Sequence, residues 1–172
     1  MKKMIRSLFS FFLVGLISAG VPYQAEAYVF NGYTVPDPQN VRYAVSSTAG
    51  QYASQITTYT NTWETYCSEI DVVSVSTSLT YDVYYYGNLT TANGTYAVTY
   101  LPGSYKIITF YQAFSQATTA QQNETIVHEF GHALGLSHCQ TALNSYSVMR
   151  ATGFNYQAYP LADDIAGIAA LY

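Results

Sequence analysis

The 172-residue sequence predicts an α+β fold, in which a single mixed sheet is backed by helices. Runs rich in aromatic and β-branched residues suit strands, whereas apolar residues that recur every three or four positions suit one face of a helix. Gly, Pro and Asn mark the boundaries between these segments. We expect, in order, a strand at 41–45, a helix at 49–67, strands at 70–75, 79–86, 94–101 and 105–110, a helix from 118 or 119 to 134, and a helix at 161–171.

In the first half of the chain, turn residues and side-chain periodicity define the elements. Residues 28–40 carry Asn31-Gly32 and Pro36-Asp37-Pro38, so we expect an irregular arm there. Residues 41–45 alternate as a half-buried strand does. Residues 49–67 space their apolar side chains three or four apart, which favours one helix despite several weak helix formers. The side chains on that face are Tyr52, Ile56, Tyr59, Trp63 and Tyr66.

In the second half, turns and caps define the elements. Gly87-Asn88 and Pro102-Gly103 end two of the four later strands. A threonine at position 118 or 119 can cap the long helix that follows them. The last helix has two aspartates in its first turn, where acidic side chains suit the helix dipole.

The first 27 residues are typical of a secretory signal peptide. A basic start is followed by the apolar run 8–19 and by Ala25-Glu26-Ala27, which offers small residues to a signal peptidase. The alternative is a membrane anchor, but the run is shorter than the ~20 residues that span a bilayer. We therefore expect removal of residues 1–27, which leaves residues 28–172 as one secreted, extracellular domain.

The mature chain would be acidic and poor in charge. The full sequence has ten acidic and six basic residues. Removal of residues 1–27 takes away one acid and three bases, so nine acids, three bases and a net charge of −6 remain. Three isolated cations form no phosphate-binding stripe and do not attract an anionic membrane. We expect a monomer with no nucleic-acid or membrane partner.

The segment from His128 to His138 reads His-Glu-Phe-Gly-His-Ala-Leu-Gly-Leu-Ser-His. His128 and His132 are four residues apart, so one helix face presents both imidazoles to a single ion. Gly135 can adopt the left-handed conformation that ends a helix, after which His138 can approach the same ion from another side. Zinc prefers such nitrogen ligands. Three unrelated surface histidines are the alternative, but all three histidines of the chain fall in this pattern.

Glu129 follows the first histidine directly and lies about 100° around the helix from it. From that position its carboxylate can lie beside the metal without binding it. It can take a proton from a zinc-bound water that then attacks a peptide bond. The motif therefore predicts a zinc hydrolase with Glu129 as general base.

Together with Met149, this segment resembles the metzincin metallopeptidases, and within that clan it is most similar to the matrixins, the group of the matrix metalloproteinases and their bacterial relatives. Met149 stands eleven residues after His138, where metzincins carry the methionine of the turn beneath the metal. Residues 94–102 resemble the strand that borders the matrixin cleft, and residues 160–172 resemble the last matrixin helix. The similarity covers nearly all of residues 41–172.

This resemblance implies a zincin-like fold with a twisted mixed sheet, two long helices of which one carries the zinc site, a Met-turn and a C-terminal helix. It implies a zinc metalloendopeptidase that acts on extended peptides or proteins. The strand residues expected to border the substrate are Thr95, Tyr96, Ala97, Val98 and Thr99.

The resemblance also implies a role for the mature N-terminus. In matrixins the free ammonium group can pair with an aspartate of the last helix. Here cleavage after Ala27 would free an ammonium group on Tyr28. The partner of that ammonium group would be Asp163 or Asp164, of which we prefer Asp164. The other aspartate would accept hydrogen bonds from the loop around Met149. Alternatively, both acids only favour the N-terminus of their helix.

The sequence departs from the matrixin pattern in three places. Val35-Pro36-Asp37 resembles part of the cysteine-switch segment but lacks its cysteine. No histidine is left for a second, structural zinc, and Ala151 stands where some metzincins place a metal-contacting tyrosine. We expect one catalytic Zn²⁺. Ca²⁺ is a further candidate, although acids are sparse in the loops.

Cys67 and Cys139 are the two cysteines. Export permits a disulfide between them, and two buried thiols are the alternative. Two other functions also stay open: a secreted module such as an adhesin with a structural zinc, and a zinc hydrolase of non-peptide amides such as those of cell-wall material. A structural zinc usually has four protein ligands, whereas three are evident here.

Overall fold

The computed structural model describes residues 28–139 and 145–172, so the predicted signal peptide lies outside the described residues. Five strands form one sheet in the order β2-β1-β3-β5-β4. β1 pairs in parallel with β2 and β3, β3 pairs in parallel with β5, and β4 runs antiparallel to β5 at the sheet edge. The strands are β1 Val41–Val45, β2 Val72–Ser74, β3 Val83–Gly87, β4 Ala97–Tyr100 and β5 Lys106–Phe110. This mixed sheet confirms the predicted α+β class.

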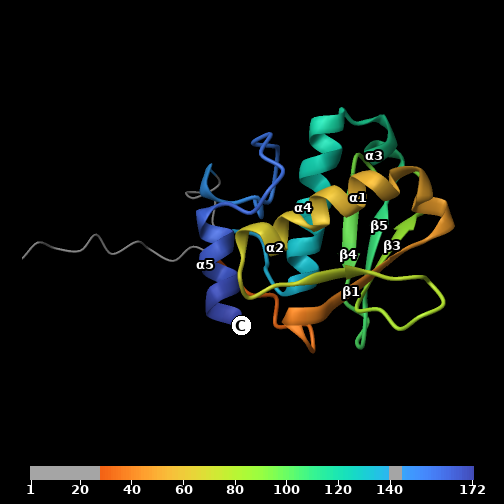
Figure 1. Ribbon diagram of the computed structural model, residues 1–172. Coiled ribbons are helices and arrows are strands. Elements are labelled where there is room, and N and C mark those ends of the chain that lie inside the picture. The colour runs from red at the N-terminus through yellow and green to blue at the C-terminus, as the bar shows by residue number, and fades with distance from the viewer. Residues whose placement is uncertain (1–27, 140–144) are drawn as a thin grey trace, which may run out of the picture.

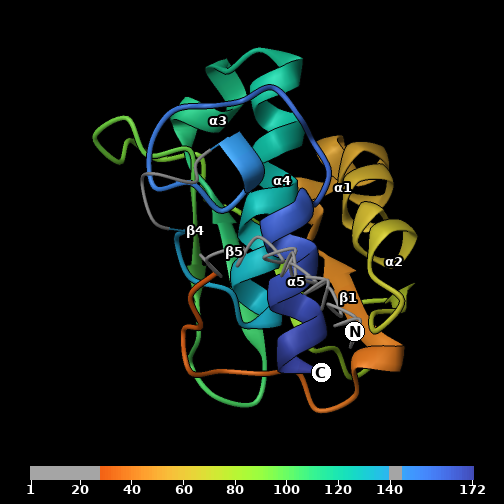
Figure 2. The same cartoon turned by 90° about the vertical axis from the view of Figure 1, so that its left-hand side faces the viewer.

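Helices cover one face of the sheet (Figure 1). Tyr85 of β3 stacks on Phe130 of α4 at 6.4 Å between ring centroids, and Phe110 of β5 stacks on Phe114 of α3 at 4.1 Å. α5 lies on the side of α4 away from the sheet (Figures 1 and 2). The helices are η1 Pro38–Asn40, η2 Ser47–Tyr52, α1 Ala53–Thr60, α2 Thr62–Tyr66, α3 Gln112–Gln116, α4 Thr119–Leu134 and α5 Ala162–Leu171. No helix among the described residues is long and apolar enough to cross a membrane.

The predicted helix 49–67 is wrong as a single helix. It begins as the 3-10 helix η2 and is interrupted at Asn61, between α1 and α2. The Thr62 hydroxyl donates to the Tyr59 carbonyl at 2.7 Å, so a side chain competes with the backbone at the break. The predicted apolar face is nevertheless used, because Ile56 and Trp63 are fully buried.

Three predicted strands are shorter than expected by more than one residue, and one α-helix was not predicted. Residues 79–82 stay outside β3: Leu79 is 54% exposed, and the Asp82 carboxylate accepts the backbone N–H of Arg42 at 2.8 Å. Residues 94–96 stay outside β4, since the N–H of Thr95 closes a turn to the Ala92 carbonyl. β2 keeps three residues of the predicted 70–75. The short helix α3 buries only Phe114, too little to leave a periodic signal.

α4 forms where the sequence predicts it because both of its ends are capped. Thr118 and Gln121 exchange hydrogen bonds in a capping box at its start. Gly135 ends it with a left-handed φ of 115°. A Cβ at this glycine would also collide with the Tyr33 carbonyl. The turn after the helix therefore requires glycine for two reasons, the left-handed φ and the close approach of Tyr33.

Candidate metal centre and cleft

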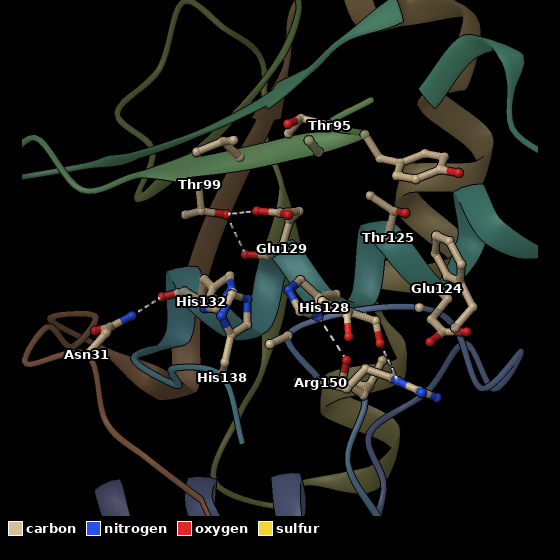
Figure 3. A pocket seen from close by; sticks show the side chains of 18 of the residues that line it. Asn31, Thr95, Thr99, Glu124, Thr125, His128, Glu129, His132, His138 and Arg150 are labelled. Atoms are coloured by element: carbon tan, nitrogen blue, oxygen red, sulfur yellow. Dashed lines mark hydrogen bonds between the residues drawn. The ribbon is translucent and has the colours of Figure 1, made fainter. Parts of the chain in front are cut away.

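Three histidines converge at the C-terminal end of α4 (Figure 3). His128 and His132 share one face of the helix, and the turn at Gly135 returns the chain so that His138 faces them. Ligand nitrogens of the three rings lie within 4.8 Å of one another. Among the described residues, this is the one group of three or more His, Cys, Asp or Glu side chains that could hold a metal ion.

Backbone carbonyls orient two of the rings. His128 Nδ1 lies 2.8 Å from the Val148 carbonyl, and His132 Nδ1 lies 2.8 Å from the Leu136 carbonyl. A carbonyl only accepts, so each Nδ1 donates and each Nε2 keeps its lone pair for a metal. Burial lowers the pKa of both imidazoles to about 4, which keeps them neutral at pH 7 as metal ligands must be.

The spacing of the nitrogens fits zinc. His132 Nε2 and His138 Nε2 are 3.3 Å apart. Two ligands at 2.0–2.1 Å from a tetrahedral zinc ion are separated by about 3.4 Å. Three neutral imidazoles are a donor set that zinc accepts, with its fourth position left for water or substrate.

Glu129 lies between the histidines and the sheet edge (Figure 3). It is only 6% exposed, and burial raises the pKa of its carboxyl group, while His132 and Thr99 oppose that rise. The Thr99 hydroxyl on β4 lies 2.6 Å from Glu129 Oε2 and 2.8 Å from the Glu129 carbonyl oxygen, both of which are acceptors. The carboxylate is therefore fixed in direction but is not one of the grouped metal ligands.

Met149 packs beneath the metal site. It is 2% exposed, and its side chain fills the space that a Cβ at Gly131 of α4 would occupy. Its carbonyl accepts the N–H of Cys139 at 2.8 Å, which ties the residue after the third histidine to the Met-turn. Trp63 approaches the same glycine, so the zinc helix touches two buried side chains at this point.

Asp164 of α5 holds the Met-turn. Its carboxylate accepts the Ser147 hydroxyl, the N–H of Val148 at 2.7 Å and the N–H of Leu161 at 2.8 Å. Burial raises the pKa of Asp164 to about 6, and these hydrogen bonds counteract part of the rise. The Val148 carbonyl in turn orients His128, so α5 is linked to the metal site through one backbone segment.

Asp164 therefore has the role that the sequence analysis gave to the other aspartate, because it holds the loop around Met149. The pairing of Tyr28 with either aspartate stays a prediction. Tyr28 packs against α5, where a Cβ at Gly167 would lie 2.9 Å from the Tyr28 Cβ. Tyr28, Asp163 and Asp164 line the same small cavity.

The predicted disulfide is not formed in the structure. Cys67 and Cys139 are buried thiols, and burial raises the pKa of Cys67 to about 12. The bridge was predicted from the compartment alone, and the sequence could not show how the two side chains pack. Cys67 ends α2 inside the hydrophobic core.

A cleft of roughly 490 Å³ runs beside the histidines. The predicted substrate strand, residues 95–99, borders it on one side. The segment 150–154 borders it on the other, and Phe154 meets Tyr96 edge-to-face at 5.2 Å. The structure thus brings the histidines, Glu129 and residues 95–99 together around one cavity.

Sequence reasoning missed several residues of this site, among them the segment 150–154, Glu124 and Asn31. Glu124, one helical turn before His128, is 2% exposed and accepts the backbone N–H groups of Asn155 and Tyr156, at 3.0 and 2.6 Å, which fixes the far wall of the cleft. Asn31 lines the cleft from the N-terminal arm. Glu124 could have been predicted as a site residue because it is a carboxylate on the metal-binding helix. Asn31 precedes a glycine, and that pattern predicts only a turn.

Known proteins resemble this chain in sequence and fold. Residues 94–172 match the family model of the matrixins. Two solved structures of myroilysin share the fold, each with 18% sequence identity. One has a TM-score of 0.61 and covers 85% of this chain and 98% of its own; the other has a TM-score of 0.57 and covers 88% and 96%. No curated protein matches the sequence. The family match over residues 94–172 and the histidine cluster within it support a matrixin-like metzincin domain, that of a zinc metalloendopeptidase.

Proposed function

We propose that this protein is a secreted endopeptidase that cleaves extended peptides in the cleft beside β4, with Glu129 as general base. The observation that supports this proposal most is the environment of Glu129. Its buried carboxylate lies beside three convergent histidines, is held by Thr99 and lines an open cleft. A purely structural zinc site requires no such carboxylate.

Each part of the site has a distinct chemical role. His128, His132 and His138 would hold Zn²⁺, which supplies Lewis-acid chemistry by polarising the scissile carbonyl and acidifying a water. Glu129 takes the proton from the attacking water and delivers it to the leaving amine. Thr99 keeps the carboxylate directed towards the cleft while the proton moves.

β4 is suited to bind an extended substrate. It is the last strand of the described sheet, and β5 is the one described strand that pairs with it. Its outer edge can therefore offer backbone N–H and C=O groups to a peptide that adds as a further strand. The cleft along residues 95–99 has room for side chains of such a peptide.

Two alternatives predict different outcomes from one assay. A secreted module with a structural zinc would bind zinc and hydrolyse nothing, and a hydrolase of cell-wall amides would leave proteins intact. A casein or gelatin zymogram, run with and without a metal chelator, separates the three. We expect clearing that the chelator abolishes and added zinc restores. A zinc-loaded protein that leaves both substrates intact would contradict the proposal.

The proposal includes export and cleavage before Tyr28. The basic start, the apolar run 8–19 and Ala25-Glu26-Ala27 support export. Tyr28 packs at the first turns of α5, so its new ammonium group would lie near Asp163, where it would form an ion pair that a longer chain could not form.

Extension of the mature N-terminus by two residues tests this pairing. We expect a lower melting temperature and lower activity than in the protein that begins at Tyr28. The same two residues added after Tyr172 serve as the control and should change neither. If the N-terminally extended protein behaves as the control does, the aspartates only favour the start of their helix.

A further inference from the structure

The N-terminal arm is attached to the turn that joins the second and third histidines. Phe30 forms an antiparallel bridge with Leu136. The N–H of Asn31 donates to the Gly135 carbonyl at 2.9 Å, and the N–H of Ser137 donates to the Val29 carbonyl at 2.6 Å. Residues 29–31 thus run along residues 135–137 as a short strand would, although they are more than 100 residues apart in sequence.

The Asn31 side chain adds contacts that few residue types could provide. Its Nδ2 donates to the carbonyl of His132 at 2.8 Å (Figure 3). It also donates to the carbonyl of Leu136 at 3.1 Å. Its Oδ1 accepts the N–H of Tyr33 at 3.0 Å. One carboxamide therefore uses both of its N–H groups and its oxygen, in the orientation that all three contacts require.

The Leu136 carbonyl connects this carboxamide to the metal site. The same oxygen accepts from His132 Nδ1 at 2.8 Å, so Asn31 and the His132 imidazole share one acceptor. A fixed acceptor sets the ring plane and leaves Nε2 directed at the ion. His138 follows Leu136 by two residues, so the hydrogen bonds to the Leu136 carbonyl also help to place the third histidine.

We infer that Asn31 is a positioning residue of the metal site, which fixes the His132 imidazole and the turn that delivers His138. This inference rests on the proposed zinc centre. The His132 carbonyl also accepts the N–H of Gly135 at 3.1 Å, and water could take the place of the Asn31 amide on both carbonyls. Water would not hold the turn in one orientation, so the cost of losing Asn31 is expected in metal binding.

The test replaces Asn31 in protein expressed from the full sequence. Asn31→Ala removes all three side-chain contacts, and Asn31→Asp keeps the acceptor but sets a carboxylate against two carbonyl oxygens. Asn40→Ala is the matched control, because Asn40 is exposed and ends the short helix η1 far from the histidines in sequence. Zinc affinity is measured by competition with a chromogenic chelator, and the visible spectrum of the Co²⁺-loaded protein reports ligand geometry.

We expect zinc affinity to fall about 10- to 100-fold in both Asn31 variants, as loss of a contact that orients a ligand typically does. Their Co²⁺ spectra should change, whereas Asn40→Ala should match the parent in both measurements. Fluorescence of Trp63, the single tryptophan, follows unfolding of the metal-free proteins and separates metal binding from stability. If either Asn31 variant does not fold, Asn31→Gln, which keeps the amide one methylene further out, should show a smaller loss in affinity.

Folded Asn31 variants with the affinity and Co²⁺ spectrum of the parent would overturn this inference while leaving the proposed function intact. The same holds if the variants only lower the stability of the metal-free protein. A parent protein without zinc affinity would instead contradict the proposed function and this inference with it.

Discussion

Residues 94–172 carry the three histidines, Glu129, Met149 and the edge strand β4, whereas residues 28–93 carry three of the five strands and the helices α1 and α2. The matrixin family model matches the second region and not the first. Yet the fold shared with myroilysin extends over 85% or more of the chain, and so includes much of the first region. The second region holds the residues that the proposed chemistry uses, whereas the first region contributes buried side chains such as Ile56 and Trp63 to the core.

The two regions meet beneath the zinc helix. Trp63 from the first region and Met149 from the second both approach Gly131, and Trp63 Nε1 donates to the Val127 carbonyl at 3.2 Å. Asn31 makes a second connection at the C-terminal end of the helix. The first region thus supports the metal site through a few specific contacts, and each can be tested separately.

The largest expected effect on stability is that of Trp63→Ala. Truncation of a fully buried aromatic side chain typically costs 3–5 kcal/mol of the free energy of unfolding. Denaturant unfolding of the metal-free protein measures it. Leu79→Ala, in the same region but 54% exposed, is the control and should stay within about 0.5 kcal/mol of the parent. Equal stability of the two variants would show that Trp63 does not support the zinc helix.

Gly131→Ala should have an intermediate effect, because it adds one methyl group between the two regions. The new Cβ would lie 2.9 Å from Trp63 Cζ2 and would collide with the Met149 side chain. Overpacking of this kind costs about 1–3 kcal/mol. Gly50→Ala is the control, since no atom lies within 4 Å of a Cβ there, and it should be neutral or slightly stabilising. A neutral Gly131→Ala would mean that the contact is looser than the structure indicates.

Met149→Leu should have the smallest effect. A swap that keeps apolar volume usually costs less than about 1.5 kcal/mol, so the variant should fold, bind zinc and retain much of the activity. Zinc content and unfolding measured on one preparation check both expectations. Loss of zinc from a folded Met149→Leu protein would show that the methionine does more than pack.

The sequence predicted the residues of the metal site more accurately than it predicted the ends of the helices and strands. α4 was predicted to within one residue because Thr118 and Gly135 are local signals at its two ends. The break at Asn61 was missed because a hydrophobic face remains periodic through a short interruption. Strand ends were overestimated where exposed residues such as Leu79 have strand propensity but no partner to pair with.

The remaining errors concern contacts between residues distant in sequence. Asn31 precedes a glycine and is typical of a turn, and nothing local indicates that it binds a helix 101 residues away. That Asp164 and not Asp163 holds the Met-turn depends on which side of α5 faces that turn. The disulfide prediction failed for the same reason, since compartment and composition contain no geometry.

Glu129→Ala provides the most direct test of the central claim that a zinc centre and a separate general base share one cleft. Zinc content and the rate of casein hydrolysis should be measured on the same preparation, beside the parent protein and His132→Ala. We expect one zinc per chain in Glu129→Ala and a hydrolysis rate at least about 10²-fold lower, as removal of a general base typically causes, with zinc lost only in His132→Ala. A Glu129→Ala protein that holds zinc and hydrolyses casein at the parental rate would contradict the account.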